Sequence, residues 1–344
     1  MKAKLFRCKS LAALPLLISL TGCEARLDLE GVEKTLAEAV RRTDQWQAIA
    51  ANDQTLVVVG QAGILLTAER STNPQWRRQQ LPTAAPLVDV VSCGDGWLAI
   101  LAADRTVWLS RDNGAEWQPH GVDTQESLLT ITCAPDNSLW LGGSFSTLLN
   151  STDGGQQWQQ NAIGEDAQIT AIQFLDSDIA YAVGEFGLVA RSDDGGSNWR
   201  VVNYMPDEFY PQSLWFRTPD QGWVTGLTGT VLRTDDGGQS WVTEETPTSM
   251  PLYQVGGIST ASTNDRYVLG DNSTLLLGRG QQDSGWRFSM VSPSPMFLAD
   301  AIQIDNTLLV VGGGGAIYDL DLNTQAAASQ VTNVVADVVA EGGL

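Results

Sequence analysis

An eight-residue motif recurs four times at almost constant spacing, and it constrains the fold more than any other feature of the chain. Each copy begins with Ser or Thr, has Asp at its third position and Gly at its fifth, and ends with Trp. The closing tryptophans follow one another at intervals of 41, 41 and 42 residues, and weaker copies end at Trp76 and Trp286. A fixed period of this length is typical of folds that repeat one small structural unit. The four complete copies end at Trp117, Trp158, Trp199 and Trp241.

Each period holds four short apolar segments separated by Gly- and Asp-rich turns. In one period these segments are residues 168–175, 180–183, 187–191 and 199–202. Four short strands in about 40 residues are typical of one blade of a β-propeller. We therefore predict an all-β fold, a seven-bladed β-propeller over residues 44–320. The seven second strands are expected at Leu56–Gly60, Trp97–Leu101, Leu139–Gly143, Tyr181–Gly184, Trp223–Gly226, Tyr267–Gly270 and Leu308–Gly312.

The residue types of the motif favour a structural role. An Asp side chain accepts backbone N–H bonds in a tight turn, a Gly tolerates the left-handed backbone, and a Trp packs between blades. Calcium binding or acid catalysis by the aspartates is the weaker alternative, because one active site does not need four copies of its residues. The structural residues are Asp112, Gly114, Trp117, Asp153, Gly155, Trp158, Asp194, Gly196, Trp199, Asp236, Gly238 and Trp241.

The N-terminus has the pattern of a targeting signal. Residues 1–10 carry four basic and no acidic side chains, and an apolar run follows at Leu11–Leu20, too short to span a bilayer. The run leads into Leu-Thr-Gly-Cys, which resembles a bacterial lipobox, in which the cysteine is lipidated after cleavage in front of it. We predict a lipoprotein signal peptide at residues 1–22, lipidation of Cys23 and a tether at residues 23–43; an ordinary signal peptide with a chance cysteine is the alternative.

The predicted anchor implies a periplasm-facing protein of the bacterial cell envelope. Bacterial lipoproteins with Asp after the lipidated cysteine tend to stay at the inner membrane, whereas this chain has Glu24. The resemblance therefore favours the outer membrane.

Charge excludes several classes of function. The 344 residues include 40 Asp and Glu against 20 Lys and Arg, a net charge of −20, which becomes −24 once residues 1–22 with their four basic side chains are removed. Such an acidic surface repels nucleic acid and anionic lipid. The single histidine, His120, rules out His-rich metal sites, and we assign it to the surface. We predict no metal, no cofactor and no catalytic residue.

The motif resembles the Asp-box, or bacterial neuraminidase (BNR) repeat. The regular array of V-G-x-x-G turns after the second strands is similar to the photosystem II assembly/stability factor-like propellers, whose relatives occur widely in non-photosynthetic bacteria. The resemblance covers residues 44–320 and implies a non-enzymatic scaffold or assembly factor for a membrane or envelope protein complex; a transporter of the resistance-nodulation-division class is one candidate partner. Photosynthetic members carry a basic patch, whereas the loops here offer almost only Arg105, so a basic partner fits this chain better.

A periplasmic Asp-box glycosidase or glycan-binding protein is the alternative function. Sialidases share the repeat, but their first-blade Arg-Ile-Pro signature has no counterpart here. A glycosidase needs two carboxylates that face each other across a cleft. The chain has 40 acidic residues, and the sequence singles out no pair among them. A glycan-binding protein could use tryptophans outside the motif as stacking platforms, namely Trp97, Trp108, Trp140, Trp215 and Trp223.

The loops between second and third strands share one face of a propeller with the connections between blades. The longest such connection, residues 203–212, is rich in aromatic residues and Met, a composition typical of interface cores. The alternative is a local cluster that covers the end of a sheet. The predicted partner-binding residues are Phe145, Glu185, Phe186, Tyr204, Met205, Asp207, Glu208, Phe209 and Tyr210.

Two features of the sequence leave alternatives open. Cys93 and Cys133 end the first strands of successive blades, so they form either a disulfide or, if their Cα atoms lie beyond about 7 Å, two buried thiols. The seventh blade lacks a clear fourth strand. Either the tether segment or the C-terminal tail, residues 321–344, completes it.

Overall fold

The computed structural model describes residues 30–260, 263–278, 285–322 and 332–333. The chain divides into two units, residues 1–38 and 39–344. In the first unit, the described part contains helix α1 (Glu30–Ala37), which falls within the predicted tether. No helix among the described residues is long and apolar enough to cross a membrane.

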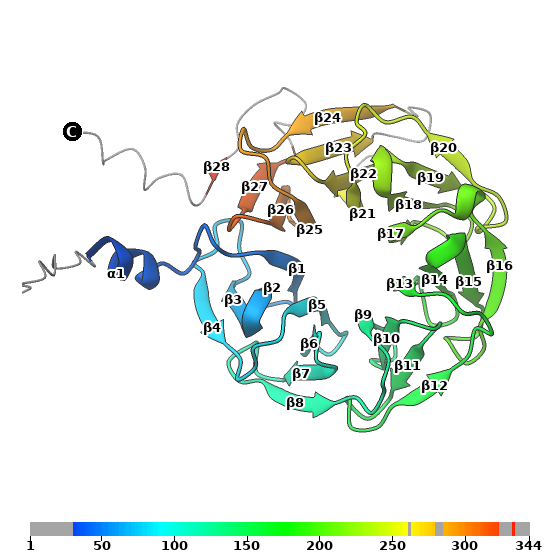
Figure 1. Cartoon of the computed structure of the whole chain (residues 1–344), viewed down its shortest axis with the longest axis horizontal. Coiled ribbons are helices and arrows are strands. Elements are labelled where there is room, and N and C mark those ends of the chain that lie inside the picture. Colours follow the sequence, from blue (N-terminus) through cyan, green and yellow to red (C-terminus); the bar gives the residue numbers. More distant parts are fainter. Residues whose placement is uncertain (1–29, 261–262, 279–284, 323–331, 334–344) are drawn as a thin grey trace, which may run out of the picture. The chain divides into compact units, whose positions relative to one another are not determined.

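The second unit is a ring of seven four-stranded antiparallel sheets, each built from four consecutive strands (Figure 1). This confirms the predicted seven-bladed propeller. Blades 1 to 4 contain β1 (Trp46–Ala51), β2 (Thr55–Gly60), β3 (Ile64–Glu69), β4 (Arg77–Gln80), β5 (Leu87–Ser92), β6 (Leu98–Ala102), β7 (Thr106–Ser110), β8 (Gln118–Gly121), β9 (Leu128–Cys133), β10 (Leu139–Gly143), β11 (Leu148–Ser151), β12 (Gln159–Asn161), β13 (Ile169–Phe174), β14 (Ala180–Gly184), β15 (Leu188–Ser192) and β16 (Arg200–Tyr204). Blades 5 to 7 contain β17 (Pro211–Phe216), β18 (Gly222–Gly226), β19 (Val231–Thr234), β20 (Val242–Glu244), β21 (Leu252–Thr260), β22 (Thr263–Gly270), β23 (Thr274–Gly278), β24 (Trp286–Met290), β25 (Leu298–Ile304), β26 (Thr307–Gly312), β27 (Ile317–Asp321) and β28 (Thr332–Asn333).

Hydrophobicity decreases from the second strand of a blade to its outer edge. Every residue of β2, with the sequence TLVVVG, is buried, because this strand is covered by its own sheet neighbours and by the adjacent blades. The outer strand β4, with the sequence RRQQ, has no buried residue. The uninterrupted apolar second strands of the sequence therefore form the packed layers between blades.

The ring closes between blades 7 and 1. The backbone N–H of Ile49 donates to Asp300 Oδ2 at 2.9 Å, and Gln45 forms an antiparallel bridge with Gly313. In the seventh sheet, β28 pairs with β27 through Asn333 and Thr332, so a segment of the C-terminal tail supplies the fourth strand there.

The repeated motif forms the same turn in all four complete copies. In blade 4 the buried hydroxyl of Ser192 accepts the N–H of Gly196 at 2.8 Å and donates to Asp194 at 2.9 Å. Asp194 in turn accepts the N–H of Asn198 at 2.8 Å, and these hydrogen bonds lower the pKa of its carboxyl. The other three copies repeat this pattern. The carboxylate is exposed, so the buried part of the turn is the hydroxyl.

The closing tryptophans of the motif pack against the preceding blade. Trp158, for example, lies against the cluster of blades 2 and 3 that contains Leu109. Of the five tryptophans considered as stacking platforms, four are buried in the core, and the fifth, Trp215, is half-buried and stacks on Trp223 with ring centroids 5.3 Å apart. None of these five offers an open stacking platform.

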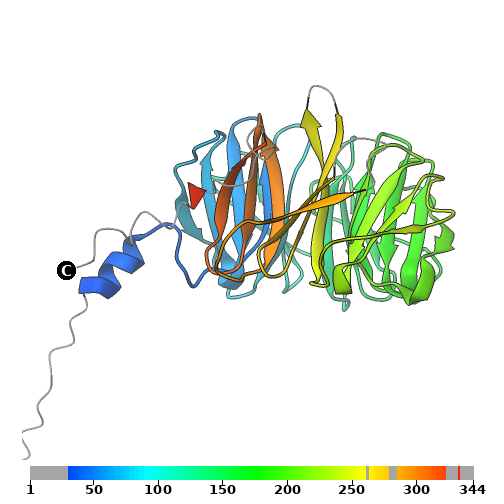
Figure 2. The ribbon, with the colours of Figure 1, turned by 90° about the horizontal axis from the view of Figure 1, so that it is seen from above.

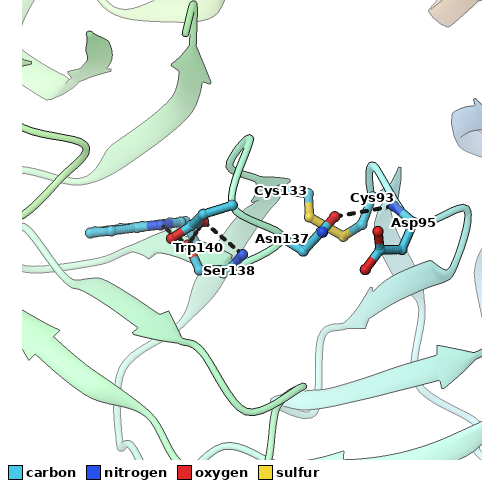
Figure 3. The surroundings of a disulfide bond; sticks show 7 residues. Cys93, Asp95, Cys133, Asn137, Ser138 and Trp140 are labelled. Carbon is cyan, nitrogen blue, oxygen red and sulfur yellow. Dashed lines mark hydrogen bonds between the residues drawn. A yellow bond between two sulfur atoms is a disulfide. The ribbon is translucent and has the colours of Figure 1, made fainter. Parts of the chain in front are cut away.

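A disulfide joins Cys93 to Cys133, and the two Cα atoms are 5.4 Å apart (Figure 3). Cys133 is the last residue of β9, and Cys93 directly follows β5, so the bond links the first strands of blades 2 and 3. The turns beyond the two cysteines are also connected, because the N–H of Asp95 donates to Asn137 Oδ1 at 3.2 Å. Adjacent first strands thus lie close enough for the bridge.

Candidate functional site

Consecutive antiparallel strands place two kinds of loop at opposite ends of the ring (Figure 2). We call loop face the end that carries the connections between blades and the tips between second and third strands. The seven tips are residues 61–63, 103–105, 144–146, 185–187, 227–229, 271–273 and 313–315. The repeated Asp turns, between third and fourth strands, lie at the other end, the box face.

A funnel opens at the centre of the loop face. Every first strand contains a β-bulge near its start, and the residue that is skipped in the pairing register turns toward the axis. All seven skipped residues line one cavity of about 590 Å³, together with Gln168, Tyr210 and Phe297. The seven are Gln47, Val88, Leu129, Thr170, Gln212, Tyr253 and Ala299.

Two carboxylates lie next to the bulges and connect neighbouring blades. Asp89 accepts the N–H of Ile131 at 2.9 Å, and Asp300 accepts the N–H of Ile49 at 2.9 Å and the amide of Gln254 at 3.0 Å. Burial raises the pKa of Asp89 to about 6 and that of Asp300 to about 7, and the charge of Asp89 adds to the second shift. Their backbone partners indicate a structural role, because they hold adjacent first strands together.

Large apolar side chains are exposed on one half of the loop face. Phe145 is 67%, Phe186 57% and Leu227 48% exposed, at the tips of blades 3, 4 and 5. The corresponding tips of blades 1, 2 and 7 carry no large apolar side chain, because their sequences are Gln-Ala-Gly, Ala-Asp-Arg and Gly-Gly-Gly. We call half-rim the exposed apolar residues of blades 3 to 6 on this face: Phe145, Phe186, Tyr204, Leu227, Met250 and Met290.

The tips of the loop face share a left-handed backbone conformation, including the two that carry phenylalanine. Phe145 and Phe186 have φ angles of 53° and 59°, in the left-handed region that L-residues with large side chains rarely adopt. Both phenyl rings are exposed, so neither contributes to the core. Each of the other five tips also holds a left-handed residue, for example Ala62, Arg105 and Thr228, so this conformation belongs to the turn and not to the two phenylalanines. What distinguishes these two tips is an exposed aromatic ring, and exposed apolar groups often mark contacts with other molecules.

The same half of the loop face is acidic. The tips and connections of blades 3 to 6, between residues 122 and 273, contain no Lys or Arg. The acidic side chains in these loops belong to Asp123, Glu126, Glu165, Asp166, Glu185, Asp207, Glu208, Glu245 and Asp271. A partner that meets the half-rim therefore encounters a negative potential.

Most predicted partner-binding residues reach this surface. Phe145, Phe186, Tyr204, Asp207 and Glu208 are exposed. Slight burial and the nearby carboxylate of Glu165 raise the pKa of Tyr204.

The other predicted residues take part in the fold to different degrees. Glu185 and Phe209 are half-buried; Glu185 accepts the N–H of Gln168 at 3.1 Å. Tyr210 is also half-buried and lines the funnel.

The prediction was wrong for the exposure of Met205. Its side chain is 2% exposed and packs in the core cluster with Tyr181 and Leu214, while its N–H donates to Gly187 at 2.7 Å. The turn η3 (Pro206–Glu208) directs Met205 inward and its neighbours outward.

The sequence prediction missed Leu227, Met250 and Met290. Leu227 lies in the tip of blade 5 that corresponds to the tip of Phe186 in blade 4, so its position in the repeat indicates an exposed apolar side chain. The sequence prediction selected aromatic residues at the tips and therefore omitted this leucine.

A cavity of about 740 Å³ lies on the box face beside blade 1 and is lined mainly by polar residues such as Arg70 and Arg77. His120 is half-buried and lines a separate cavity of about 240 Å³ with Arg111. No Phe, Tyr or Trp side chain lines either cavity. Among the described residues, no group of three or more His, Cys, Asp and Glu side chains could hold a metal ion.

The fold and this face define a seven-bladed propeller with a loop surface suited to contact another macromolecule. The family described as photosynthesis system II assembly factor YCF48 matches residues 68–202 and 191–341. The chain belongs to this family. A comparison with curated proteins finds no match.

Solved structures with the same fold include a YCF48 bound to a D1 peptide, with a TM-score of 0.65, 16% identity, and coverage of 79% of this chain and 90% of that one. YCF48 from Cyanidioschyzon merolae aligns with a TM-score of 0.65 and 12% identity over 82% of this chain and 96% of that one. A catalytically inactive virginiamycin B lyase from Staphylococcus aureus aligns with a TM-score of 0.69 and 11% identity, over 80% of this chain and 94% of that one. At such identities the likeness concerns the fold alone.

Proposed function

We propose that this protein is a non-enzymatic scaffold or assembly factor that binds an envelope or membrane protein complex through its loop face. The observation that carries the proposal is the half-rim, where the rings of Phe145 and Phe186 are exposed at the tips of two neighbouring blades. Support also comes from the family, which is named for an assembly factor, and from a member of the fold whose structure contains a D1 peptide.

The proposal includes a place in the cell. Lipidation of Cys23 would anchor the protein in the envelope with its propeller in the periplasm, and Glu24 favours the outer membrane. A resistance-nodulation-division transporter is one partner of the kind proposed. In this setting the Cys93–Cys133 disulfide suits an oxidising compartment.

Anchoring is tested by replacing the cysteine. Cys23→Ser should abolish lipid modification and shift the protein from the membrane fraction to the soluble fraction. Mass spectrometry of the unaltered protein should find a lipid-modified N-terminal Cys23. A Cys8→Ser variant is the matched control, because Cys8 lies in the segment predicted to be removed. Membrane association that survives Cys23→Ser would contradict the anchor.

Docking is tested by changing the half-rim. A Phe145→Ser, Phe186→Ser variant should fold normally, because both rings are exposed, and should lose captured envelope proteins. The matched control is Val242→Ser, which removes a 60% exposed apolar side chain from the outer strand of blade 5. Unchanged capture by the double variant would contradict docking at this surface.

The glycosidase or glycan-binding alternative has less support. The tryptophans that would serve as platforms are buried or half-buried, and the family is that of an assembly factor.

A further inference from the structure

The last residues before β1 are attached firmly to the loop face. The side chains of Asp44 and Arg78 form an ion pair at 2.8 Å and are only 4% and 17% exposed. The Arg78 guanidinium also donates to the carbonyl of Ala39 at 2.9 Å, and the N–H of Gly315 donates to the carbonyl of Asp44 at 2.8 Å. Gly315 belongs to the tip of blade 7, so the chain enters the propeller on the loop face, between blades 7 and 1.

This entry point limits how far the loop face can lie from a lipid on Cys23. Residues 23–38 form the connection, and eight of them are in α1. With helical and extended rises per residue, the connection spans at most about 40 Å. A lipid anchor would therefore keep the entry point on the loop face within about this distance of the membrane surface.

The half-rim lies on the same face but away from the entry point. Arg41, Arg42 and Arg105 belong to loop-face segments of blades 1 and 2, whereas those of blades 3 to 6 carry acidic residues and no basic ones. Anionic lipid headgroups are repelled by this half, so the surface is unsuited to lie on the bilayer itself. A positively charged protein segment is the occupant that this potential attracts.

Charge alone does not describe the occupant. Phe145, Phe186 and Leu227 stand on consecutive blades and alternate with acidic connections, so the surface presents apolar and negative groups in turn. The neighbouring funnel, about 590 Å³ and partly lined by Tyr210 and Tyr253, has room for an apolar side chain.

Building on the proposed function, we propose that the half-rim and funnel together bind one basic, apolar segment of a membrane protein, close to where that protein meets the bilayer. Lysine or arginine side chains of the segment pair with the acidic connections, and its apolar side chains cover the phenyl rings of Phe145 and Phe186. One apolar side chain enters the funnel.

The first test uses synthetic peptides and the purified propeller. A twelve-residue peptide that alternates Lys with Leu and Trp should bind, whereas the same peptide with Glu in place of Lys, or with Ser in place of the apolar residues, should bind at least about tenfold more weakly. Raising the salt concentration from about 50 to 300 mM should weaken the first complex severalfold. Equal binding of the acidic peptide would overturn the proposal.

Matched variants locate the peptide. Glu165→Gln, Asp166→Asn, Asp207→Asn, Glu208→Gln should reduce binding about tenfold and remove most of its salt dependence, and Phe145→Ser, Phe186→Ser, Leu227→Ser should reduce binding by a similar factor. The control, Asp104→Asn on the tip of blade 2, should leave affinity unchanged. Equal losses in the control and the half-rim variants would overturn the proposal.

A photo-crosslinking residue at position 186 in cells separates this inference from the proposed function. A crosslink to a basic, membrane-proximal segment supports both. A crosslink to a neutral or acidic segment of an envelope protein overturns the inference and leaves the proposed function standing. No protein crosslink at all overturns both.

Discussion

Glu244 and Arg266 form an ion pair enclosed between blades 5 and 6, with 3.5 Å between Oε2 and Nη2 and side chains only 4% and 3% exposed. The indole N–H groups of Trp223 and Trp286 donate to the same carboxylate at 3.3 and 2.9 Å. The guanidinium also lies 4.8 and 4.7 Å from the centroids of these two indole rings. Charged hydrogen bonds and cation–π contacts thus connect the two blades.

Removing one charge of this pair should be costly. Glu244→Gln removes the buried negative charge that Arg266 and Arg233 share, and we expect a loss of about 3–5 kcal/mol in the free energy of unfolding. Urea denaturation followed by tryptophan fluorescence measures the change. The control Glu245→Gln alters an adjacent exposed carboxylate and should cost under about 0.5 kcal/mol. Similar losses in the two variants would contradict the assignment.

In the repeated Asp turn, the hydroxyl should matter more than the carboxylate. Ser192→Ala leaves the buried N–H of Gly196 without its acceptor, and we expect a loss of about 1–3 kcal/mol in unfolding free energy. Asp194→Ala should lower the melting temperature less, because its carboxylate is exposed. Ser197→Ala in the same turn is the control. A larger effect of Asp194→Ala than of Ser192→Ala would show that the carboxylate dominates.

Stability should fall as pH rises from about 4 to 7. The folded protein holds protons on Asp89 and Asp300, whose pKa values are raised to about 6 and about 7, while the unfolded chain releases them near pH 4. The folded state thus binds more protons in this window, and its stabilisation is lost as pH rises through the two raised pKa values. At about 1.4 kcal/mol per pKa unit, the combined effect between pH 4 and 7 is on the order of 6 kcal/mol. Denaturation curves at several pH values should show a flatter dependence for Asp300→Asn, and an unchanged profile would contradict the assignment.

Acid should weaken the fold through other groups. Hydrogen bonds lower the pKa of Asp153 and Asp194, so their contribution is complete above the ordinary carboxyl pKa and disappears as pH falls through the lowered values. Together with the preceding effect, this predicts greatest stability near pH 4–5.

Reduction should destabilise the propeller. The Cys93–Cys133 bond closes a loop with a sequence separation of 40 residues, for which chain entropy predicts about 2–4 kcal/mol of stabilisation. Thermal unfolding with and without a thiol reductant measures this difference. A Cys93→Ser, Cys133→Ser variant should match the reduced protein and be insensitive to reductant, and a reductant effect that persists in this variant would point to another cause.

The number of blades could be predicted from the sequence, because each blade is marked by short patterns of neighbouring residues. Turn residues such as Asp194 and Gly196 recur at a fixed interval, and second strands such as β2 form uninterrupted apolar runs. The bulges that line the funnel could not be read, since skipped residues such as Gln47 and Leu129 share no residue type. Met205 was misplaced because only the backbone turn at η3 decides which of the apolar residues of its loop faces the core. The exposure of Phe145 and Phe186 agrees with their place in short polar turns between two strands, although the same turns also bury side chains such as that of Ser146.

The central claim, that the half-rim contacts an envelope protein, is tested most directly by photo-crosslinking in cells. A crosslinking residue replaces Phe186 on the loop face in one variant and Val242 on the outer strand of blade 5 in another, two apolar positions with similar exposure of 57% and 60%. We expect position 186 to yield a discrete crosslinked complex with a membrane or envelope protein, and position 242 to yield none. Equal crosslinking at both positions, or none at position 186, would contradict the claim.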